Sequence, residues 1–194
     1  GPGSYLSEQV VLGKKVIIGA NCVIDGDISI GNGTVIEPGV VVVGKVTIGN
    51  DCYIQAGVCI GVAGYGYVED GQHHKTMVHH YGGVEVGNRV FIGSHTNIAR
   101  GTIDNTIIED GVKIAPSTHI GHNNHIKQNA SVVCSTLYGS VVTGRNAYIS
   151  ASLIRNQISI GDDSIVGMGS LVTKDVEPGV TVVGSPAKPL IRNK

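Results

Sequence analysis

The sequence has no tryptophan and only one phenylalanine among its 194 residues, and aromatic residues make up 4% of the chain. A core of ordinary thickness normally contains large aromatics, because each of them buries about 150–250 Å². Valine and isoleucine must therefore fill nearly all of the interior. This composition predicts a narrow core rather than that of an ordinary globular domain.

An excess of charge of one sign is also absent, since 14 Lys and Arg stand against 15 Asp and Glu. No basic stripe or basic run with interleaved aromatics occurs, so nucleic acid and anionic membranes are not expected partners. No apolar run reaches the roughly 18–20 residues of a membrane span. Residues 1–4 read as a remnant of expression, and no export signal is visible, so we expect a cytoplasmic protein.

Closely spaced cysteines are missing as well, because the four that occur (Cys22, Cys52, Cys59 and Cys134) show no CxxC pattern. Disulfide frameworks are typical of smaller secreted chains with denser cysteine. We therefore expect reduced thiols, most of them in the interior.

Glycine, in contrast, is abundant at 29 of 194 residues, against a usual ~7%. Aliphatic residues recur at every sixth position, often followed by glycine. They are Leu12, Ile18, Ile24, Ile30, Ile36, Val42, Ile48, Ile54 and Ile60. Hexads of this kind cannot bury a face alone and must stack. Three hexads give a triangular coil of about 18 residues, and successive coils pair as parallel strands ~4.8 Å apart.

The six-residue frame is interrupted after residue 60 and resumes at Val86. From the later breaks we predict insertions at 61–85, near 104–107, around 132–137 and near 149–154. The resulting organisation is an all-β helix domain over 5–176 with a loop insertion at 64–83, followed by a C-terminal tail at 177–194.

This repeat resembles that of the hexapeptide-repeat acyltransferases. The resemblance implies a left-handed parallel β-helix, a hand that crossover rules alone would not predict, because they favour the right hand. It also implies a homotrimer with active sites between subunits. Apolar residues outside the core frame, such as Val41, Val43 and Tyr53, agree with lateral burial.

The hexad at residues 120–125 contains the first candidate for catalysis, His122, with His119 just before it and His125 at its end. Imidazole titrates near pH 6.5 and suits a general base; the alternative is three solvated surface histidines. Counting one coil onward, with the one-residue slip in the frame, places Gly139 over His122. The Gly139 amide is then a candidate oxyanion donor.

Three stretches, at 64–67, 97–106 and 120–123, resemble the UDP-3-O-acylglucosamine N-acyltransferases of lipid A synthesis. In that family the histidine that matches His122 is the catalytic base. Asn123 and Asp104 would orient it or contact substrate, or else only cap corners. The later Gly-His element of the family has no match near residues 156–157, and we expect no uridine-binding domain ahead of the repeat. The other expected substrate contacts are Arg100, Asn105, His119, His125 and Tyr65.

The C-terminal stretches 166–176 and 183–189 resemble the ending of hexapeptide acetyltransferases that use acetyl-CoA. There, small residues let pantetheine lie against the coil edge, and cations suit the phosphates. The alternative is a capping coil with a solvated tail. The expected cofactor-binding residues are Gly167, Gly169, Lys174, Pro186 and Lys188.

The insertion at 64–83 has glycines at both ends and two His-His pairs, which suggest a substrate-contacting lid or a metal site. The γ-class carbonic anhydrases also resemble this repeat and bind zinc with three histidines. His74 and His79 have the five-residue spacing of the later two, but no histidine precedes His73. We therefore expect no metal.

The sequence thus predicts an acetyl-CoA-dependent N-acetyltransferase with an amino sugar as acceptor, most simply a nucleotide-linked one, in bacterial polysaccharide or glycoconjugate synthesis. The alternatives are a sugar O-acetyltransferase, an N-acyltransferase of the lipid A type with a longer acyl donor, and a non-catalytic scaffold.

Overall fold

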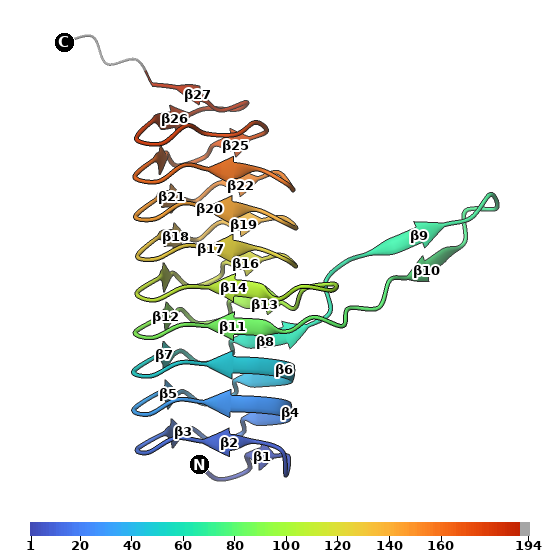
Figure 1. The fold of residues 1–194 in the computed structure, drawn as a ribbon, viewed down its shortest axis with the longest axis vertical. Coiled ribbons are helices and arrows are strands. Elements are labelled where there is room, and N and C mark those ends of the chain that lie inside the picture. The colour runs from blue at the N-terminus through green and yellow to red at the C-terminus, as the bar shows by residue number, and fades with distance from the viewer. Residues whose placement is uncertain (191–194) are drawn as a thin grey trace.

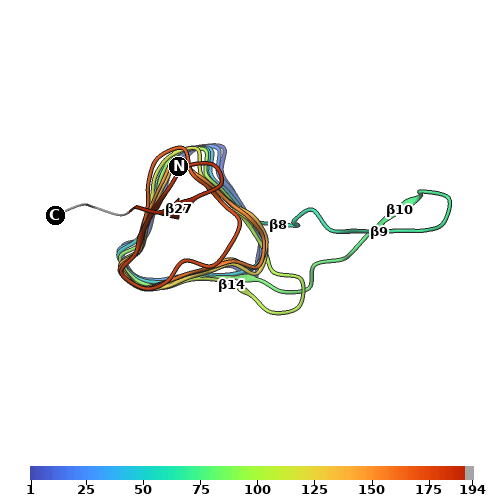
Figure 2. The ribbon, with the colours of Figure 1, turned by 90° about the horizontal axis from the view of Figure 1, so that it is seen from above.

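A computed structural model describes residues 1–190 of the chain. These residues form twenty-seven short strands joined by turns, wound into a left-handed parallel β-helix with a triangular cross-section (Figures 1 and 2). The predicted fold class is confirmed. No helix in this range is long and apolar enough to cross a membrane.

Three flat faces run along the axis, and most coils contribute one strand to each face (Figure 2). The first face contains β1 (Tyr5–Leu6), β8 (Cys59–Val62), β13 (Asn97–Ala99), β16 (His119–Ile120), β19 (Thr136–Leu137), β22 (Leu153–Ile154) and β25 (Leu171–Val172). The second face contains β2 (Val11–Leu12), β11 (Val84–Val86), β14 (Thr106–Ile108), β17 (His125–Ile126), β20 (Val142–Thr143) and β23 (Ser159–Ile160). Two longer strands bend around the corner between these faces and belong to both, β4 (Val23–Ile30) and β6 (Val41–Ile48).

The third face is built in the same way. It contains β3 (Ile17–Ile18), β5 (Val35–Ile36), β7 (Tyr53–Ile54), β12 (Phe91–Ile92), β15 (Lys113–Ile114), β18 (Ser131–Val133), β21 (Tyr148–Ser150), β24 (Ile165–Val166) and β26 (Thr181–Val183). β27 (Lys188–Pro189) pairs antiparallel with β26 and closes the C-terminal end.

The core contains the predicted six-residue frame together with positions four residues after it, such as Val40 and Val58. Ile24 pairs in register with Val42, and Val42 pairs with Ile60. All three side chains are 0% exposed. Each face contributes one such ladder of aliphatic side chains, so the interior is too narrow for large aromatics. Leu12, in the first coil, is 41% exposed.

Two of the predicted insertions are wrong. Ile120 pairs with Leu137, and Leu137 pairs with Ile154. These coils are therefore one residue shorter than the coil that joins Ile24 to Val42. The missing residue lies at the corners near Cys134 and Ala151, which turn with positive φ angles of 44° and 39°. The frame breaks at 132–137 and 149–154 are thus tightened corners.

The insertion after β8 forms an arm, residues 64–83, that projects from the corner between the first and second faces (Figures 1 and 2). Its outer part is a hairpin of β9 (Tyr67–Glu69) and β10 (Lys75–Met77). Its root is fastened to a smaller bulge at 100–105, because Tyr81 N donates to Thr102 O at 2.7 Å and Gly83 N donates to Asn105 Oδ1 at 2.7 Å.

The chain ends pack on the helix. Ser4 Oγ donates to Gly19 O at 2.7 Å, so residues near the start contact the first coil. The parallel ladder continues past residue 176, because β26 pairs with β24. The last four residues of the predicted tail, 191–194, lie outside the described residues.

Candidate active site

A cleft of about 420 Å³ opens where the root of the arm meets the corner between the first and second faces. The loops after β8, β13, β16, β19 and β22 reach it, because these strands stack and end at this corner. The residues that line it are Gly64, Tyr65, Ala99, His119, Gly121, His122, Tyr138, Gly139, Ser140, Asn156 and Gln157.

Asn123 holds the His122 ring in one orientation. The Nδ1 atom of His122 lies 2.9 Å from Asn123 Oδ1. That oxygen also accepts from Thr102 N at 3.0 Å, while Asn123 Nδ2 donates to Asp104 O at 3.0 Å. These partners fix which end of the amide faces the ring. Because an amide oxygen only accepts, Nδ1 of His122 carries the proton and Nε2 is left with a free lone pair.

The bulge at 100–105 therefore acts on His122 through Asn123. Asn123 adopts a positive φ of 57°, a conformation that asparagine tolerates better than most residues. Its amide N–H donates to Thr106 Oγ1 at 2.9 Å. Asp104 contributes its backbone carbonyl to this arrangement.

Gly139 lies directly against the His122 ring. A Cβ at position 139 would be 2.6 Å from Nε2 of His122, closer than side-chain atoms approach. Asn32 and Asn50 occupy the same position in their turns as Gly139, two residues after the core residue, and the backbone N–H of each donates to an Asn side chain in the next coil. Asn156 is the residue above Gly139 in the next coil, but among the described residues its side chain accepts no hydrogen bond from Gly139 N–H. The Gly139 N–H can therefore bind an oxygen from outside the chain.

His119 is a second imidazole in the cleft. Its Nδ1 lies 3.1 Å from Asn97 Nδ2, which donates, so Nε2 of His119 carries the proton. Burial lowers the pKa of His119 below its ordinary value of 6.5. When both rings are neutral, these hydrogen bonds leave the cleft with one imidazole donor, at His119, and one imidazole acceptor, at His122.

The arm contributes a further histidine, which sequence reasoning missed. His80 is 5% exposed, and its ring centroid lies 5.4 Å from that of His122 in an edge-to-face arrangement. The His-His pairs of the insertion suggested only a lid or a metal. The fold of the arm root brings His80 to the cleft, and no repeat period encodes that fold.

The other predicted substrate contacts are placed differently. Tyr65 lines the cleft and is 80% exposed. Arg100 lies one coil before His122, and its Nη1 atom is close to Gly44. His125 lies on the second face and pairs with Glu109 at 2.6 Å, outside the cleft. Asn105 is occupied at the arm root, because its Nδ2 donates to Glu85 at 2.5 Å.

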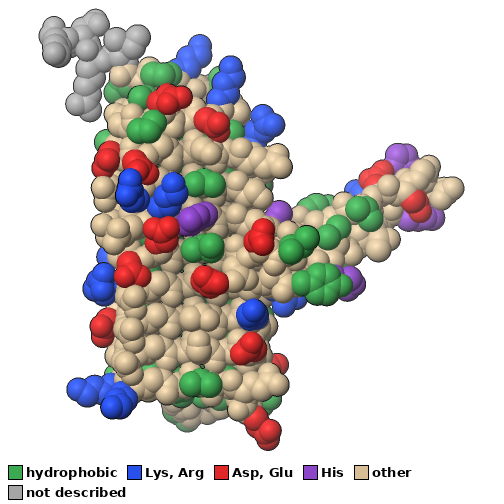
Figure 3. Space-filling view, in the orientation of Figure 1, with side chains coloured by type: hydrophobic (Ala, Val, Ile, Leu, Met, Phe, Trp, Pro, Cys, Tyr) green, Lys and Arg blue, Asp and Glu red, His purple; other side chains and the backbone are tan. Residues whose placement is uncertain are grey.

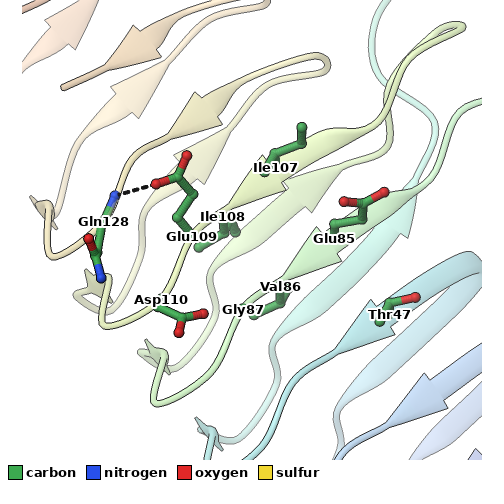
Figure 4. Close-up of a pocket in the computed structure, with 9 residues that line it drawn as sticks. All are labelled: Thr47, Glu85, Val86, Gly87, Ile107, Ile108, Glu109, Asp110 and Gln128. Atoms are coloured by element: carbon green, nitrogen blue, oxygen red, sulfur yellow. Dashed lines mark hydrogen bonds between the residues drawn. The ribbon is translucent and has the colours of Figure 1, made fainter. Parts of the chain in front are cut away.

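A second hollow of about 490 Å³ lies on the second face (Figure 4). Three carboxylates line it, and each already has partners within the fold. Glu109 accepts from Gln128 N at 2.9 Å, Glu85 accepts from Asn105, and Asp110 accepts from Asn88 N at 2.7 Å. These bonds to the Asn88 backbone and side chain lower the pKa of Asp110. We assign no chemistry to this hollow.

The predicted cofactor-binding residues fall into separate places. Lys174, Pro186 and Lys188 line one cavity of about 380 Å³ at the C-terminal end, where Lys and Arg side chains gather (Figure 3). Gly169 lines another hollow, and a Cβ at Gly167 would be 2.7 Å from Val183.

Lys174 is nevertheless aligned with the corner that carries His122. The strand registers place His122, Gly139, Asn156 and Lys174 above one another on successive coils. A cation thus lies three coils from His122 on the same edge of the helix.

Among residues 1–190, no group of three or more His, Cys, Asp or Glu side chains is arranged so that it could hold a metal ion. Two of the arm histidines pair with carboxylates of the same hairpin, His73 with Glu69 and His74 with Asp70.

Comparison with known proteins agrees with the repeat. The family model described as bacterial transferase hexapeptide (six repeats) matches residues 27–61. The model described as hexapeptide repeat of succinyl-transferase matches residues 9–43 and 143–174.

Curated relatives share part of the chain. UDP-3-O-acylglucosamine N-acyltransferase of Herminiimonas arsenicoxydans is 35% identical over 123 residues, which cover 62% of this chain and 35% of that protein. The enzyme of the same name from Bordetella avium is 37% identical over 126 residues, with the same coverage. The chain therefore spans about a third of the length of these relatives.

Solved structures share the whole helix. LpxA from Acinetobacter baumannii superimposes with a TM-score of 0.88 at 26% identity, covering 98% of this chain and 72% of that one. The UDP-N-acetylglucosamine acyltransferase from Bacteroides fragilis gives a TM-score of 0.88 at 22% identity, covering 98% of this chain and 73% of that one, which shows a common fold. With its six-residue repeat and these relatives, the chain belongs to the hexapeptide-repeat acyltransferase family.

Proposed function

We propose that the chain transfers an acyl group from a thioester donor to the amine of a nucleotide-linked amino sugar. The observation that carries this proposal is the orientation of His122, whose Nδ1 is bound to Asn123 and whose Nε2 faces Gly139 with a free lone pair. A neutral imidazole in this tautomer is a general base. The adjacent N–H of Gly139 suits the oxygen on which negative charge develops.

The reaction then proceeds by direct attack. The amine nitrogen attacks the thioester carbonyl carbon while Nε2 of His122 takes one of the amine protons. The carbonyl oxygen becomes an oxyanion bound by Gly139 N–H. Its collapse breaks the carbon–sulfur bond, and the leaving thiolate takes up the proton held by His122. The products are an amide on the sugar and a free thiol.

The acceptor class rests on the named activity of the curated relatives, UDP-3-O-acylglucosamine N-acyltransferase. That name favours N-acyl transfer of the lipid A type over the simple acetyl transfer that the C-terminal residues led us to expect. Tyr65 lines the arm side of the cleft, which supports its proposed role as a contact to the acceptor. Arg100, one coil before His122, supplies a cation for the acceptor's phosphates.

The donor is proposed to lie along the corner towards the C-terminal end. Lys174 is three coils from His122, a separation of about 14 Å at ~4.8 Å per coil. Its ammonium group suits the phosphate of coenzyme A or of a phosphopantetheine carrier. Acetyl-CoA is a short donor of this kind.

We further propose that the chain works as a homotrimer. Tyr53 and Phe91 stack on the outside of the third face with ring centroids 6.1 Å apart. Tyr53 remains 40% exposed, so this face offers apolar area to a neighbour. Light scattering at micromolar concentration should give three times the mass of one chain; a monomer would contradict the proposal.

The test of the activity is thiol release from acetyl-CoA and from longer acyl donors, on CoA and on acyl carrier protein. The acceptors are UDP-linked amino sugars and their hydroxyl counterparts. His122→Ala should lower turnover by ~10²–10⁴-fold. His95→Asn, a histidine change on another corner, should leave turnover near wild type.

The outcomes separate the alternatives. Thiol release that requires an amine supports the proposal. Among such results, a requirement for a longer acyl chain indicates the lipid A type of transfer, and release with acetyl-CoA alone indicates a simple N-acetyltransferase. Release with hydroxyl sugars only would indicate O-acyl transfer and contradict the proposal. Full activity of His122→Ala would show that His122 is not the general base.

A further inference from the structure

The Nε2 atom of His80, at the root of the arm, has no hydrogen-bond partner among the described residues. The Nδ1 atom of the same ring lies 2.9 Å from Val78 O. A carbonyl oxygen only accepts, so Nδ1 carries the proton and Nε2 has a free lone pair. Nε2 is buried and has no partner among the described residues. Buried polar atoms of this kind are rare in folded proteins and call for an explanation.

The position of Nε2 points to the cleft. A Cβ at Gly64 would lie 3.1 Å from His80 Nε2 and 2.9 Å from His122 Cδ2. Gly64 lines the cleft, so only a residue without a side chain separates Nε2 from the space beside His122. A Cβ at Gly66 would lie 3.3 Å from His80 Cε1. Because Gly64 and Gly66 have no side chains, the backbone of this segment can pack directly on the His80 ring.

The segment after His80 is fixed to the body of the helix. Tyr81 N donates to Thr102 O, and Gly82 N donates to Gly101 O at 3.1 Å. The bulge that binds Tyr81 and Gly82 also orients Asn123, the partner of His122. His80 and His122 are therefore held by one framework, while the segment at 64–66 that covers His80 lies between β8 and β9, where the chain enters the arm.

We propose that His80 is a specificity-determining residue whose Nε2 accepts a hydrogen bond from an O–H or N–H of the acceptor sugar, next to the amine that His122 deprotonates. This inference rests on the proposed function. A small displacement of Gly64 on acceptor entry exposes Nε2, and the acceptor then satisfies it. No covalent step involves His80.

Two substitutions separate the two ring nitrogens. His80→Asn keeps an amide N–H where Nδ1 donates to Val78 O but places nothing at Nε2. His80→Gln places an amide near Nε2. We expect His80→Asn to weaken binding of UDP-glucosamine about tenfold, as loss of one hydrogen bond does, and His80→Gln to stay within about threefold of wild type. Isothermal titration without any acyl donor measures both, and thermal melting checks that each variant folds.

The second measurement is an NMR experiment on the chain without any substitution. In protein labelled with ¹⁵N-histidine, the His80 signals are identified by their loss in either variant. Saturation with UDP-glucosamine should move the His80 Nε2 resonance towards that of a hydrogen-bonded nitrogen.

Binding that leaves this resonance unchanged overturns the inference while leaving the proposed function intact. So does a His80→Asn variant that binds like wild type, or a His80→Gln variant that loses as much as His80→Asn. If UDP-glucosamine does not bind at all, the acceptor class of the proposed function is wrong, and the inference falls with it.

Discussion

The side chain of Asn123 accepts a hydrogen bond from His122 at 2.9 Å, and its own amide is fixed by Thr102 and Asp104. Two neighbours in the sequence thus form the proposed base and the group that orients it. The corner at 122–123 can present them side by side because Asn123 takes a positive φ of 57°.

Removal of the Asn123 side chain should therefore reduce turnover without unfolding the protein. Asn123→Gly keeps a residue that accepts positive φ. Loss of one orienting hydrogen bond, worth roughly 1.4 kcal/mol, should lower kcat about tenfold, while KM for the donor stays near wild type. Steady-state kinetics measures both constants. An unchanged kcat would mean that packing alone orients His122.

Gly139→Ala should impair the same site by a steric route. The new Cβ would lie 2.6 Å from His122 Nε2, so the ring must move away from its position. We expect kcat to fall by at least about 100-fold, the lower end of a general-base contribution. Gly71→Ala is the matched control, because a Cβ at position 71 meets nothing within 4 Å. If both variants were equally active, the ring would not occupy this place during turnover.

Much of the fold follows from the sequence because the six-residue frame is also the unit of burial. Ile54 and Ile60 are fully buried, as expected from that frame. The position of Gly139 above His122 could be predicted from the same frame, after the one-residue slip was included in the count. The same count gives five residues instead of six from Val132 to Leu137 and from Ile149 to Ile154, so the expectation of insertions at these two places was wrong on the sequence itself.

The rest of the site depends on contacts that no period describes. His80 reaches His122 only because the arm folds back onto the bulge at 100–105. His125 differs from His122 by three positions, yet the corner turns it to another face, where it meets Glu109. The residue types suggested chemistry at both His122 and His125. Only the corner geometry separates these two.

Protonation of Asp110 at low pH should reduce the free energy of unfolding. Hydrogen bonds from Asn88 hold the pKa of this carboxyl below its ordinary value. A lowered pKa contributes stability that is present above about pH 4, the unfolded value, and is lost as the pH falls through the folded value. Asp110→Asn should therefore be less stable than wild type at pH 7, and the difference should shrink below pH 4.

Urea unfolding at pH 7 and pH 3 measures this effect. Asp104→Asn is the comparison, since the Asp104 side chain makes no hydrogen bond or ion pair within the described part of the chain. That variant should differ little from wild type at either pH. A stability difference for Asp110→Asn that stays constant across the range would show that the carboxylate charge is not responsible.

Thr143 occupies a core position of the six-residue frame, where most coils have valine or isoleucine. It is 0% exposed, and its hydroxyl has no hydrogen-bond partner among the described residues. Thr143→Val replaces the hydroxyl with a methyl group of similar shape, so the free energy of unfolding should rise by about 1 kcal/mol.

Thr34→Val is the control with the opposite expectation, because the Thr34 hydroxyl does have partners. Its Oγ1 donates to Gly49 O at 2.8 Å and accepts from Cys52 N at 3.1 Å. This substitution should destabilise by about 1–3 kcal/mol, since it leaves those buried backbone groups unpaired. Urea denaturation of the two variants should thus give changes of opposite sign, and a loss of stability in Thr143→Val would show that its hydroxyl has a partner in solution.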